Sequence, residues 1–322
     1  MQPDHAETRP RRKSPTPDAG VAAKHSSAGS RLIRAAVATV MLLLVCSVLV
    51  SSAGSDNGDG TFAPPRAFYL SLGDSLGFGL QLDRLFAMLD GGTYTPDAFN
   101  TGYTDVLAAK MQRIRHGQQT VNMSCPAEDT DTMINGGCFF TLPEPDGFGL
   151  TLHTSYSGPQ LDSAVAFLRA HPHQVSPVTV SIGAGDAIGP ISDCNLDPSC
   201  IEASGLRDDL GRNLDRILGA IRAAAPDTEI ILVTNYNHFT ISNPGSDRLW
   251  QRFYTNVEKG AARRNGARVA DISEIIHGAN AVCRLTFLCS SDDSHPTDTG
   301  YKEIANQIFD VAGYDDLEGD GQ

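Results

Sequence analysis

The chain has 322 residues, of which 41% are hydrophobic, so it can bury a full core and still have terminal extensions. Its formal net charge is −13, and because residues 1–34 hold seven Lys/Arg against three Asp/Glu, the rest of the chain carries −17. An acidic body of this kind argues against a nucleic-acid partner.

The first 66 residues have no catalytic motif. Residues 1–30, rich in Pro, Ser, Ala and charge, are predicted to be a disordered basic head on the cytoplasmic side. Residues 31–53 combine a basic flank, a long apolar run and small residues, which is typical of a signal peptide or, if uncleaved, of a signal anchor in the membrane. Residues 54–66 form a Gly/Asp/Pro linker. Whether residues 31–53 are cleaved or retained, the rest of the chain is predicted to lie outside the cytoplasm, either secreted or tethered to the cell membrane.

Strand and helix signals alternate from residue 67 to residue 313. The expected strands are 67–72, 120–123, 178–182, 229–234 and 267–270. The expected helices are 101–114, 160–170, 206–221 and 299–309, and the third is the clearest because its apolar residues recur every three or four positions. This order predicts one α/β domain over 67–313, a three-layer α/β/α sandwich around a mostly parallel five-stranded sheet, followed by an acidic tail over 314–322.

Seven cysteines are present, and six of them form three pairs that are close in sequence. The pairs are Cys125 and Cys138, Cys194 and Cys200, and Cys283 and Cys289. In an exported chain such pairs favour local disulfides. A zinc site is the alternative, but the Cys-x-x-Cys spacing typical of zinc sites is missing.

The first predicted strand leads into a turn that contains Ser75, with the sequence Gly-Asp-Ser-Leu at 73–76. A serine on a tight turn at the carboxyl end of a strand exposes its hydroxyl at the sheet edge, where open α/β sheets bind ligands. Such a turn also aims the serine's own amide at an incoming carbonyl oxygen. Because Gly-Asp-Ser is a common turn tripeptide, an ordinary strand-ending turn is the alternative.

A second group of polar residues precedes the last predicted helix, on a loop at the same sheet edge. It includes Asp292, Asp293 and His295. A histidine can take the serine proton if a carboxylate holds its other ring nitrogen and stabilises the imidazolium. Spacing favours Asp292 for that role, with Asp293 as the competitor. Ser75, His295 and Asp292 are therefore the predicted catalytic triad.

Together these motifs resemble the SGNH/GDSL hydrolase superfamily, in particular its secreted, disulfide-bearing lipases and esterases. The similarity extends over nearly all of residues 67–313. Four motifs occur in the family order: Gly-Asp-Ser-Leu at 73–76, Asn-Met-Ser-Cys-Pro-Ala-Glu at 122–128, Gly-Ala-Gly-Asp at 183–186 and Asp-x-x-His-Pro at 292–296. The resemblance implies a flavodoxin-like fold and an ester hydrolase whose nucleophile is the serine of the first motif.

The two middle motifs depart from the family at positions that bind the oxyanion. Ala127 replaces the family's glycine; its amide remains a donor, and alanine is costly there only if its φ is positive. Gly185 replaces the family's asparagine, and loss of one such donor typically lowers turnover about a hundred- to a thousandfold. The predicted oxyanion hole is therefore Ser75, Ala127 and the position of Gly185. Asn235 or Asn237 could substitute for the asparagine, although the favoured interpretation is that both are ordinary turn residues.

The resulting prediction is an extracytoplasmic serine ester hydrolase that forms an acyl-serine intermediate and needs neither a metal nor an organic cofactor. Its expected partner is a small-molecule or lipid ester, with a membrane as a further partner if residues 31–53 stay uncleaved. A carbohydrate O-acetyl esterase is the alternative within the superfamily. A non-catalytic binding module is the alternative of another class, motivated by the missing asparagine, but the retained Ser, Asp and His favour an enzyme.

An apolar segment over residues 76–100 follows the nucleophile. It could line an acyl pocket or form a lid. The helical spacing of Leu82, Leu85, Phe86 and Leu89 instead favours a helix that packs on the sheet. The other histidines lack the spacing of metal ligands and are predicted to be surface or loop residues.

Overall fold

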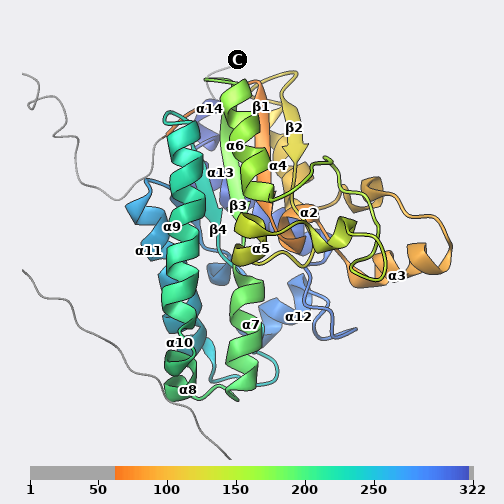
Figure 1. The fold of residues 1–322 in the computed structure, drawn as a ribbon, viewed down its shortest axis with the longest axis vertical. Helices are drawn as coiled ribbons and strands as arrows, with labels where there is room; N and C mark the ends of the chain where they lie inside the picture. Colours follow the sequence, from red (N-terminus) through yellow and green to blue (C-terminus); the bar gives the residue numbers. More distant parts are fainter. Residues whose placement is uncertain (1–61, 319–322) are drawn as a thin grey trace, which may run out of the picture. The chain divides into compact units, whose positions relative to one another are not determined.

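The protein is seen here in a computed structural model that describes residues 62–318 (Figure 1). At its centre lies a sheet of five strands: β1 (Phe68–Gly73), β2 (Gln119–Asn122), β3 (Val175–Ser181), β4 (Ile230–Val233) and β5 (Arg268–Ala270). The strand order is β2-β1-β3-β4-β5, and each neighbouring pair is parallel. All five predicted strands are confirmed, with bounds that differ by at most a few residues.

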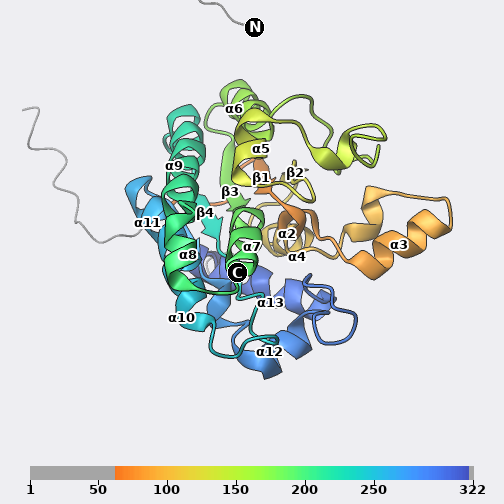
Figure 2. The same ribbon diagram turned by 60° about the horizontal axis from the view of Figure 1, so that its bottom comes forward.

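The strands point alternate residues to opposite faces, so the sheet has an apolar core on each side. One core contains Leu70 and Val178 and is covered by α5 (Thr130–Asn135), α6 (Gln160–Ala170), α9 (Leu206–Ala224) and α11 (Asn256–Arg264). The other contains Tyr69 and Ile231 and is covered by α4 (Tyr103–Met111), α12 (Gly278–Leu285) and α13 (Asp298–Ala312). Figure 2 shows helices on both sides of the strands. The predicted three-layer α/β/α sandwich is confirmed.

The longest helix, α9, shows how sequence pattern fixes position in this fold. Its residues Leu210, Leu214 and Ile217 form one stripe and are buried against the sheet. Charged residues occupy the other face, as expected for a helix that covers a sheet from the solvent side. The helix ends at Ala224, two residues before Pro226, because the residue that precedes a proline disfavours the helical conformation.

One prediction about the packing is wrong. The segment after the nucleophile does form a helix, α3 (Leu82–Asp90), but α3 does not pack on the sheet. Its apolar face belongs to a third, smaller core with Phe78, Phe99 and Phe140. The segment that contributes Phe140 comes from far along the chain. Figures 1 and 2 show α3 and this loop beside the sandwich, on the same side.

Short elements complete the described chain. They are α2 (Ser75–Phe78), α7 (Ala184–Asp193), α8 (Pro198–Ala203), α10 (Asp247–Trp250), α14 (Asp315–Glu318), the π-helix η3 (Gln251–Thr255) and the 3-10 helices η1 (Pro96–Phe99), η2 (Phe139–Thr141) and η4 (Ile272–Glu274). All three predicted disulfides are present: Cys125–Cys138, Cys194–Cys200 and Cys283–Cys289.

The predicted head at 1–30 and export segment at 31–53 lie outside the described residues, as do most of the linker and the end of the acidic tail. Within residues 62–318, no helix has both the length and the apolar character to cross a membrane.

Candidate active site

Ser75 lies at the switch point of the sheet, where the order of the strands reverses. Strand β1 is flanked by β2 on one side and β3 on the other, and such a switch point opens a crevice at the carboxyl ends of the strands. Ser75 lies two residues after the end of β1, at the start of α2. Gly73 lets the chain turn there: its φ is +124°, and a Cβ atom would lie 1.8 Å from the carbonyl oxygen of Ser181 on β3. Only glycine fits at this position.

Buried side chains hold this turn in place. The amide group of Gln160, on α6, donates to the carbonyl of Gly73 at 2.9 Å and accepts from its N–H at 2.6 Å. The carboxylate of Asp74 accepts from the N–H of Leu76 at 2.9 Å and from the hydroxyl of Ser181 at 3.1 Å. Burial raises the pKa of Asp74 to about 6, although these hydrogen bonds lower it in part. The serine is therefore presented on a rigid turn.

A line of hydrogen bonds runs from Ser75 to a buried carboxylate. Nε2 of His295 lies 2.9 Å from Oγ of Ser75, and Nδ1 of His295 lies 2.5 Å from Oδ1 of Asp293. The Asp293 side chain is only 3% exposed, and its Oδ2 accepts from the backbone N–H of Leu82 at 2.9 Å. Both carboxylate oxygens are thus fixed, and with them the orientation of the imidazole.

The prediction that Asp292 is the carboxylate partner of His295 is wrong. Asp292 is exposed and has a φ of +58°. The left-handed backbone conformation of Asp292 turns the chain, so that the side chain of Asp293 folds back onto His295. Asp293 accepts hydrogen bonds from both the backbone N–H and the ring of His295. The competitor, Asp293, therefore takes the position.

The loop that contains His295 is anchored to the end of α12. The N–H of Phe287 donates to the carbonyl of His295 at 3.0 Å, and the N–H of Thr297 donates to the carbonyl of Leu285 at 2.9 Å. The disulfide Cys283–Cys289 closes the turn beside these bonds. Backbone bonds and a covalent link therefore hold the histidine opposite Ser75.

The groups on either side of the histidine differ in charge: Asp293 is ionised and His238 is neutral. Burial raises the pKa of Asp293, but the hydrogen bond and the charge of His295 lower it more, so its pKa lies below the ordinary value. His238 also faces the site. Burial, followed by the charge of His295, lowers the pKa of His238 to about 3, so this second imidazole stays neutral. Asp293 is thus the ionised partner of His295.

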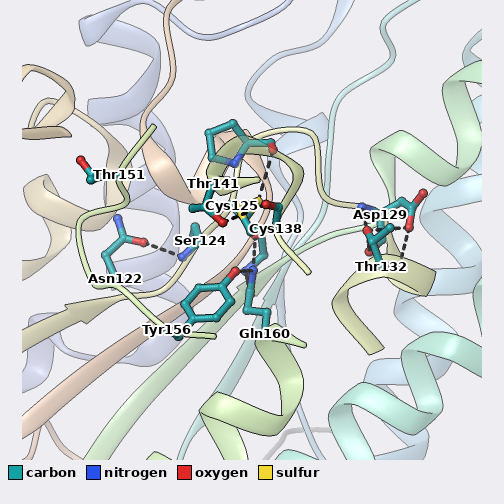
Figure 3. The surroundings of a disulfide bond; sticks show 12 residues. Asn122, Ser124, Cys125, Asp129, Thr132, Cys138, Thr141, Thr151, Tyr156 and Gln160 are labelled. Atoms are coloured by element: carbon teal, nitrogen blue, oxygen red, sulfur yellow. Dashed lines mark hydrogen bonds between the residues drawn. A yellow bond between two sulfur atoms is a disulfide. The ribbon is translucent and has the colours of Figure 1, made fainter. Parts of the chain in front are cut away.

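Two backbone amides belong to residues that line the cavity around Ser75. The N–H groups of Ser75 and Ala127 donate to no other group within residues 62–318, and both residues line the same cavity. Ala127 has a φ of +66°, a conformation that suits glycine better than alanine. Its turn is fixed by the bond from Cys125 N–H to the carbonyl of Gly73, at 2.8 Å, and by the Cys125–Cys138 disulfide (Figure 3).

The position of the missing asparagine is at the amino end of α7. Ala184 and Gly185 are the first residues of this ten-residue helix, both line the cavity, and no side chain caps the helix start. The first amides of a helix have no acceptor within the helix and carry the positive end of its dipole, so the start of α7 is suited to bind a negative charge at the cavity wall. Asn235 lines the cavity as well, whereas Asn237 does not, because its side-chain amide donates to Ser246 and Asp247.

A model of the GDSL-like lipase/acylhydrolase family matches residues 71–303, which include Ser75 and His295. The chain belongs to this family. No curated protein sequence matches the chain.

Solved structures of the GDSL fold resemble the chain at low sequence identity. A candidate GDSL-like lipase from Parabacteroides merdae has a TM-score of 0.51 at 14% identity, with coverage of 79% of this chain and 99% of the other. Phospholipase A1 from Streptomyces albidoflavus has a TM-score of 0.48 at 16% identity, covering 75% and 98%. A family two carbohydrate esterase from Cellvibrio japonicus has a TM-score of 0.44 at 14% identity, covering 78% and 63%. The first of these supports the shared fold.

The cavity of this GDSL-family protein has a volume of about 350 Å³. Its wall is mostly apolar and includes side chains from the link between α2 and α3, from α3 and from the loop after Cys138. These side chains are Leu80, Leu82, Leu85, Phe86, Phe140 and Phe148. The alternative that the segment after the nucleophile lines a pocket is therefore the correct one, and the cavity can take a hydrocarbon chain.

Glu128 is a member of this GDSL-family site that was not predicted from the sequence. The side chain is 3% exposed, lines the cavity, and has no hydrogen bond from either carboxyl oxygen to a described residue. Burial raises the pKa of Glu128 to about 8, with the nearby charges of Asp129 and Asp74 adding to the effect. The carboxyl is therefore mostly neutral at pH 7. In the sequence, the signal that Glu128 belongs to the site was its position directly after Ala127.

The zinc alternative at the cysteines does not fit. Within the part of the chain that the structure describes, Cys125, Glu128 and Cys138 form the one cluster of possible metal ligands, with ligand atoms within 4.8 Å of each other. The two sulfur atoms are bonded to each other, as Figure 3 shows, so neither is a thiolate that could bind zinc.

Proposed function

We propose that the protein is an extracytoplasmic carboxylic ester hydrolase with Ser75 as its nucleophile. The observation that supports this most is the line of hydrogen bonds from Asp293 through His295 to Ser75, with distances of 2.5 and 2.9 Å. A serine, a histidine and a carboxylate in this arrangement are the parts needed for nucleophilic acyl transfer. The position of Ser75 at the mouth of an apolar cavity adds a place for the acyl group.

The geometry leads to a two-step mechanism. In the first step Nε2 of His295 takes the proton of Ser75, whose Oγ bonds to the acyl carbon of the ester. The negative charge that forms on the carbonyl oxygen is bound by the amides of Ser75 and Ala127 and by the amino end of α7. Asp293 stabilises the imidazolium. His295 then protonates the leaving alcohol, and the acyl group stays on Ser75.

Water completes the cycle in the second step. A water molecule gives a proton to Nε2 of His295 and attacks the acyl carbon, so that a second oxyanion forms in the same place. The imidazolium returns the proton to Oγ of Ser75 as the acyl bond breaks. A carboxylic acid leaves and the serine is restored.

The shape and chemistry of the cavity favour an acyl group longer than acetyl. Its wall is formed by leucine and phenylalanine side chains, which gain stability by burying hydrocarbon. An O-acetyl group on a sugar would leave most of this apolar surface exposed to water. The lipid-type ester is therefore the better substrate class, ahead of the carbohydrate O-acetyl ester, and the intact triad geometry argues against a binding module.

Two observations support a location outside the cytoplasm. Three disulfides are typical of proteins that fold in an oxidising compartment. The sequence of residues 31–53 has the pattern of an export signal. Mass measurement of the protein recovered from its host tests this proposal: a start after residue 50 indicates cleavage, and an intact Met1 indicates a tethered protein.

The activity is tested on p-nitrophenyl esters with acyl chains from acetyl to palmitoyl. We expect turnover with an optimum beyond acetyl, and a loss of at least about a thousandfold in Ser75→Ala. Ser291→Ala is the matched control, because Ser291 is exposed and bonds only through its backbone N–H. Absence of turnover on every ester, or equal turnover in Ser75→Ala, would show that the chain is not a serine esterase.

A further inference from the structure

Exposed apolar side chains are concentrated beside the candidate active site. Among residues 62–318, seven large hydrophobic side chains are exposed, and five of them belong to two segments, α3 and the loop that follows Cys138. These five, named here the apolar rim, are Phe86, Leu89, Phe139, Leu142 and Phe148. Single exposed hydrophobic residues are normal on a protein surface, but a group of this kind is typical of an interaction site.

The two segments form one structural unit. The hydroxyl of Tyr94, just after α3, donates to the carbonyl of Thr151 at 2.8 Å, and the rings of Tyr94 and Phe140 lie 6.0 Å apart. Within the loop, the rings of Phe139 and Phe148 pack edge to face at 5.4 Å. In Figures 1 and 2 both segments lie beside the sandwich on the same side. The rim therefore belongs to one side of the molecule.

The rim continues into the cavity. Phe86 is 54% exposed and Phe148 is 51% exposed, yet both also line the cavity that contains Ser75 and His295. A molecule that covers the rim therefore meets the opening through which an acyl chain reaches the serine. The face and the site are continuous, so the occupant of the face is expected to be the source of the substrate.

The negative charge of the two segments limits which kind of surface can bind the apolar rim. Residues 82–100 and 138–152 contain five acidic residues and one basic residue. The acidic residues are Asp83, Asp90, Asp97, Glu144 and Asp146. The basic residue, Arg84, donates to the carbonyl of Ala98 and to Thr101, and pairs with Asp298. An anionic surface would be repelled, whereas a surface with exposed choline groups would not.

We propose that the apolar rim docks on a zwitterionic lipid surface, with the cavity opening toward the acyl esters of that surface. This inference rests on the proposed esterase function, and it names where the enzyme meets its substrate. A second copy of the chain fits less well, because a twofold interface would bring the acidic residues of one copy against those of the other. Insertion of exposed Phe and Leu side chains at a lipid interface supplies the binding energy.

Docking is tested by flotation of Ser75→Ala protein with phosphatidylcholine vesicles and with phosphatidylglycerol vesicles at low salt. The variant is used so that the lipid is not consumed. We expect binding to phosphatidylcholine, with a partition coefficient at least about tenfold higher than for phosphatidylglycerol. Adding Leu89→Ser, Phe139→Ser and Leu142→Ser should lower binding at least about tenfold. These three residues are in the rim but do not line the cavity.

Controls separate docking from folding and from chemistry. Ile241→Ser changes an exposed apolar residue outside the rim and should leave vesicle binding unchanged. With Ser75 intact, the three rim substitutions should change kcat/KM on soluble p-nitrophenyl butyrate by less than about twofold, because none of the three side chains lines the cavity. Asp90→Lys with Glu144→Lys should create binding to phosphatidylglycerol, because it replaces two of the five acidic residues beside the rim by basic ones.

Each result decides the proposal. No binding to phosphatidylcholine, or binding that the rim substitutions do not reduce, would overturn it. A dimer in sedimentation experiments that the rim substitutions dissociate would also overturn it, in favour of a second copy as the occupant. Rim-dependent vesicle binding in a protein that hydrolyses no ester would support the docking surface and refute the proposed function.

Discussion

Replacing Asp293 by Asn tests the central feature of the site. The side chain keeps its size but loses its negative charge, which lies beside the imidazole because Oδ1 is 2.5 Å from Nδ1 of His295. With the two charge centres about 4 Å apart and an effective dielectric constant of about 20, the lost attraction to the imidazolium is about 4 kcal/mol. At 1.36 kcal/mol per factor of ten, kcat/KM should fall about a thousandfold.

The neighbouring residue supplies a control of the same chemistry. Asp292→Asn removes an equal charge one residue away, at an exposed position with a φ of +58° that asparagine tolerates well. We expect kcat/KM within about twofold of the parent and an unchanged thermal transition. Both variants are assayed on p-nitrophenyl butyrate, with near-ultraviolet circular dichroism to compare folding. A large loss in Asp292→Asn with retained activity in Asp293→Asn would refute the assignment.

Three further predictions concern residues at or next to the proposed oxyanion hole. Ala127→Gly should raise the free energy of unfolding, measured by urea denaturation, by about 1 kcal/mol, because it removes the Cβ atom from a residue with a φ of +66°. A lower stability of the variant would contradict this argument. Gly185→Asn should raise kcat on p-nitrophenyl butyrate at least about tenfold, because it supplies the side-chain donor that this position lacks. The side chain has room, since a Cβ atom at residue 185 would have its nearest neighbours at 3.4 Å. An unchanged kcat would mean that the donor is not needed. Glu128→Gln should stabilise the protein at pH 8 by as much as about 5 kcal/mol, since burial raises the pKa of Glu128 from 4.5 to about 8. The parent binds this proton in the folded state and releases it on unfolding between those pH values, so its stability falls as pH rises from 4.5 to 8. Urea unfolding at pH 4 and pH 8 checks this, and an equal effect at both pH values would contradict it.

The sheet and its covering helices were predictable because their signals are local. Short apolar runs gave the strands, and the three- and four-residue spacing of Leu210, Leu214 and Ile217 gave the buried stripe of α9. The segment after Ser75 was different. Its spacing identified a helix but not the partner of its apolar face, which is a loop more than 40 residues away that the Cys125–Cys138 disulfide helps to position.

The carboxylate of the candidate triad depends on one backbone angle. In the sequence, Asp292 and Asp293 are equally acidic neighbours of the histidine, and a spacing of three residues favoured the first. The left-handed conformation at Asp292 turns its own side chain to solvent and folds the next carboxylate onto the ring. Asp is among the few residues that adopt this conformation easily, but no pattern in the sequence says which of two adjacent aspartates will adopt it.

The departures at Ala127 and Gly185 bear on one function, because both positions belong to the proposed oxyanion hole. Alanine keeps the backbone donor at the cost of strain, so its effect is on stability. Glycine removes a side-chain donor, yet the absence of a side chain also leaves the uncapped amides of α7 open to the cavity. If asparagine at 185 accelerates turnover, the helix end is only a partial substitute. If it slows turnover, the amides of α7 are already the third donor, and the new side chain blocks them.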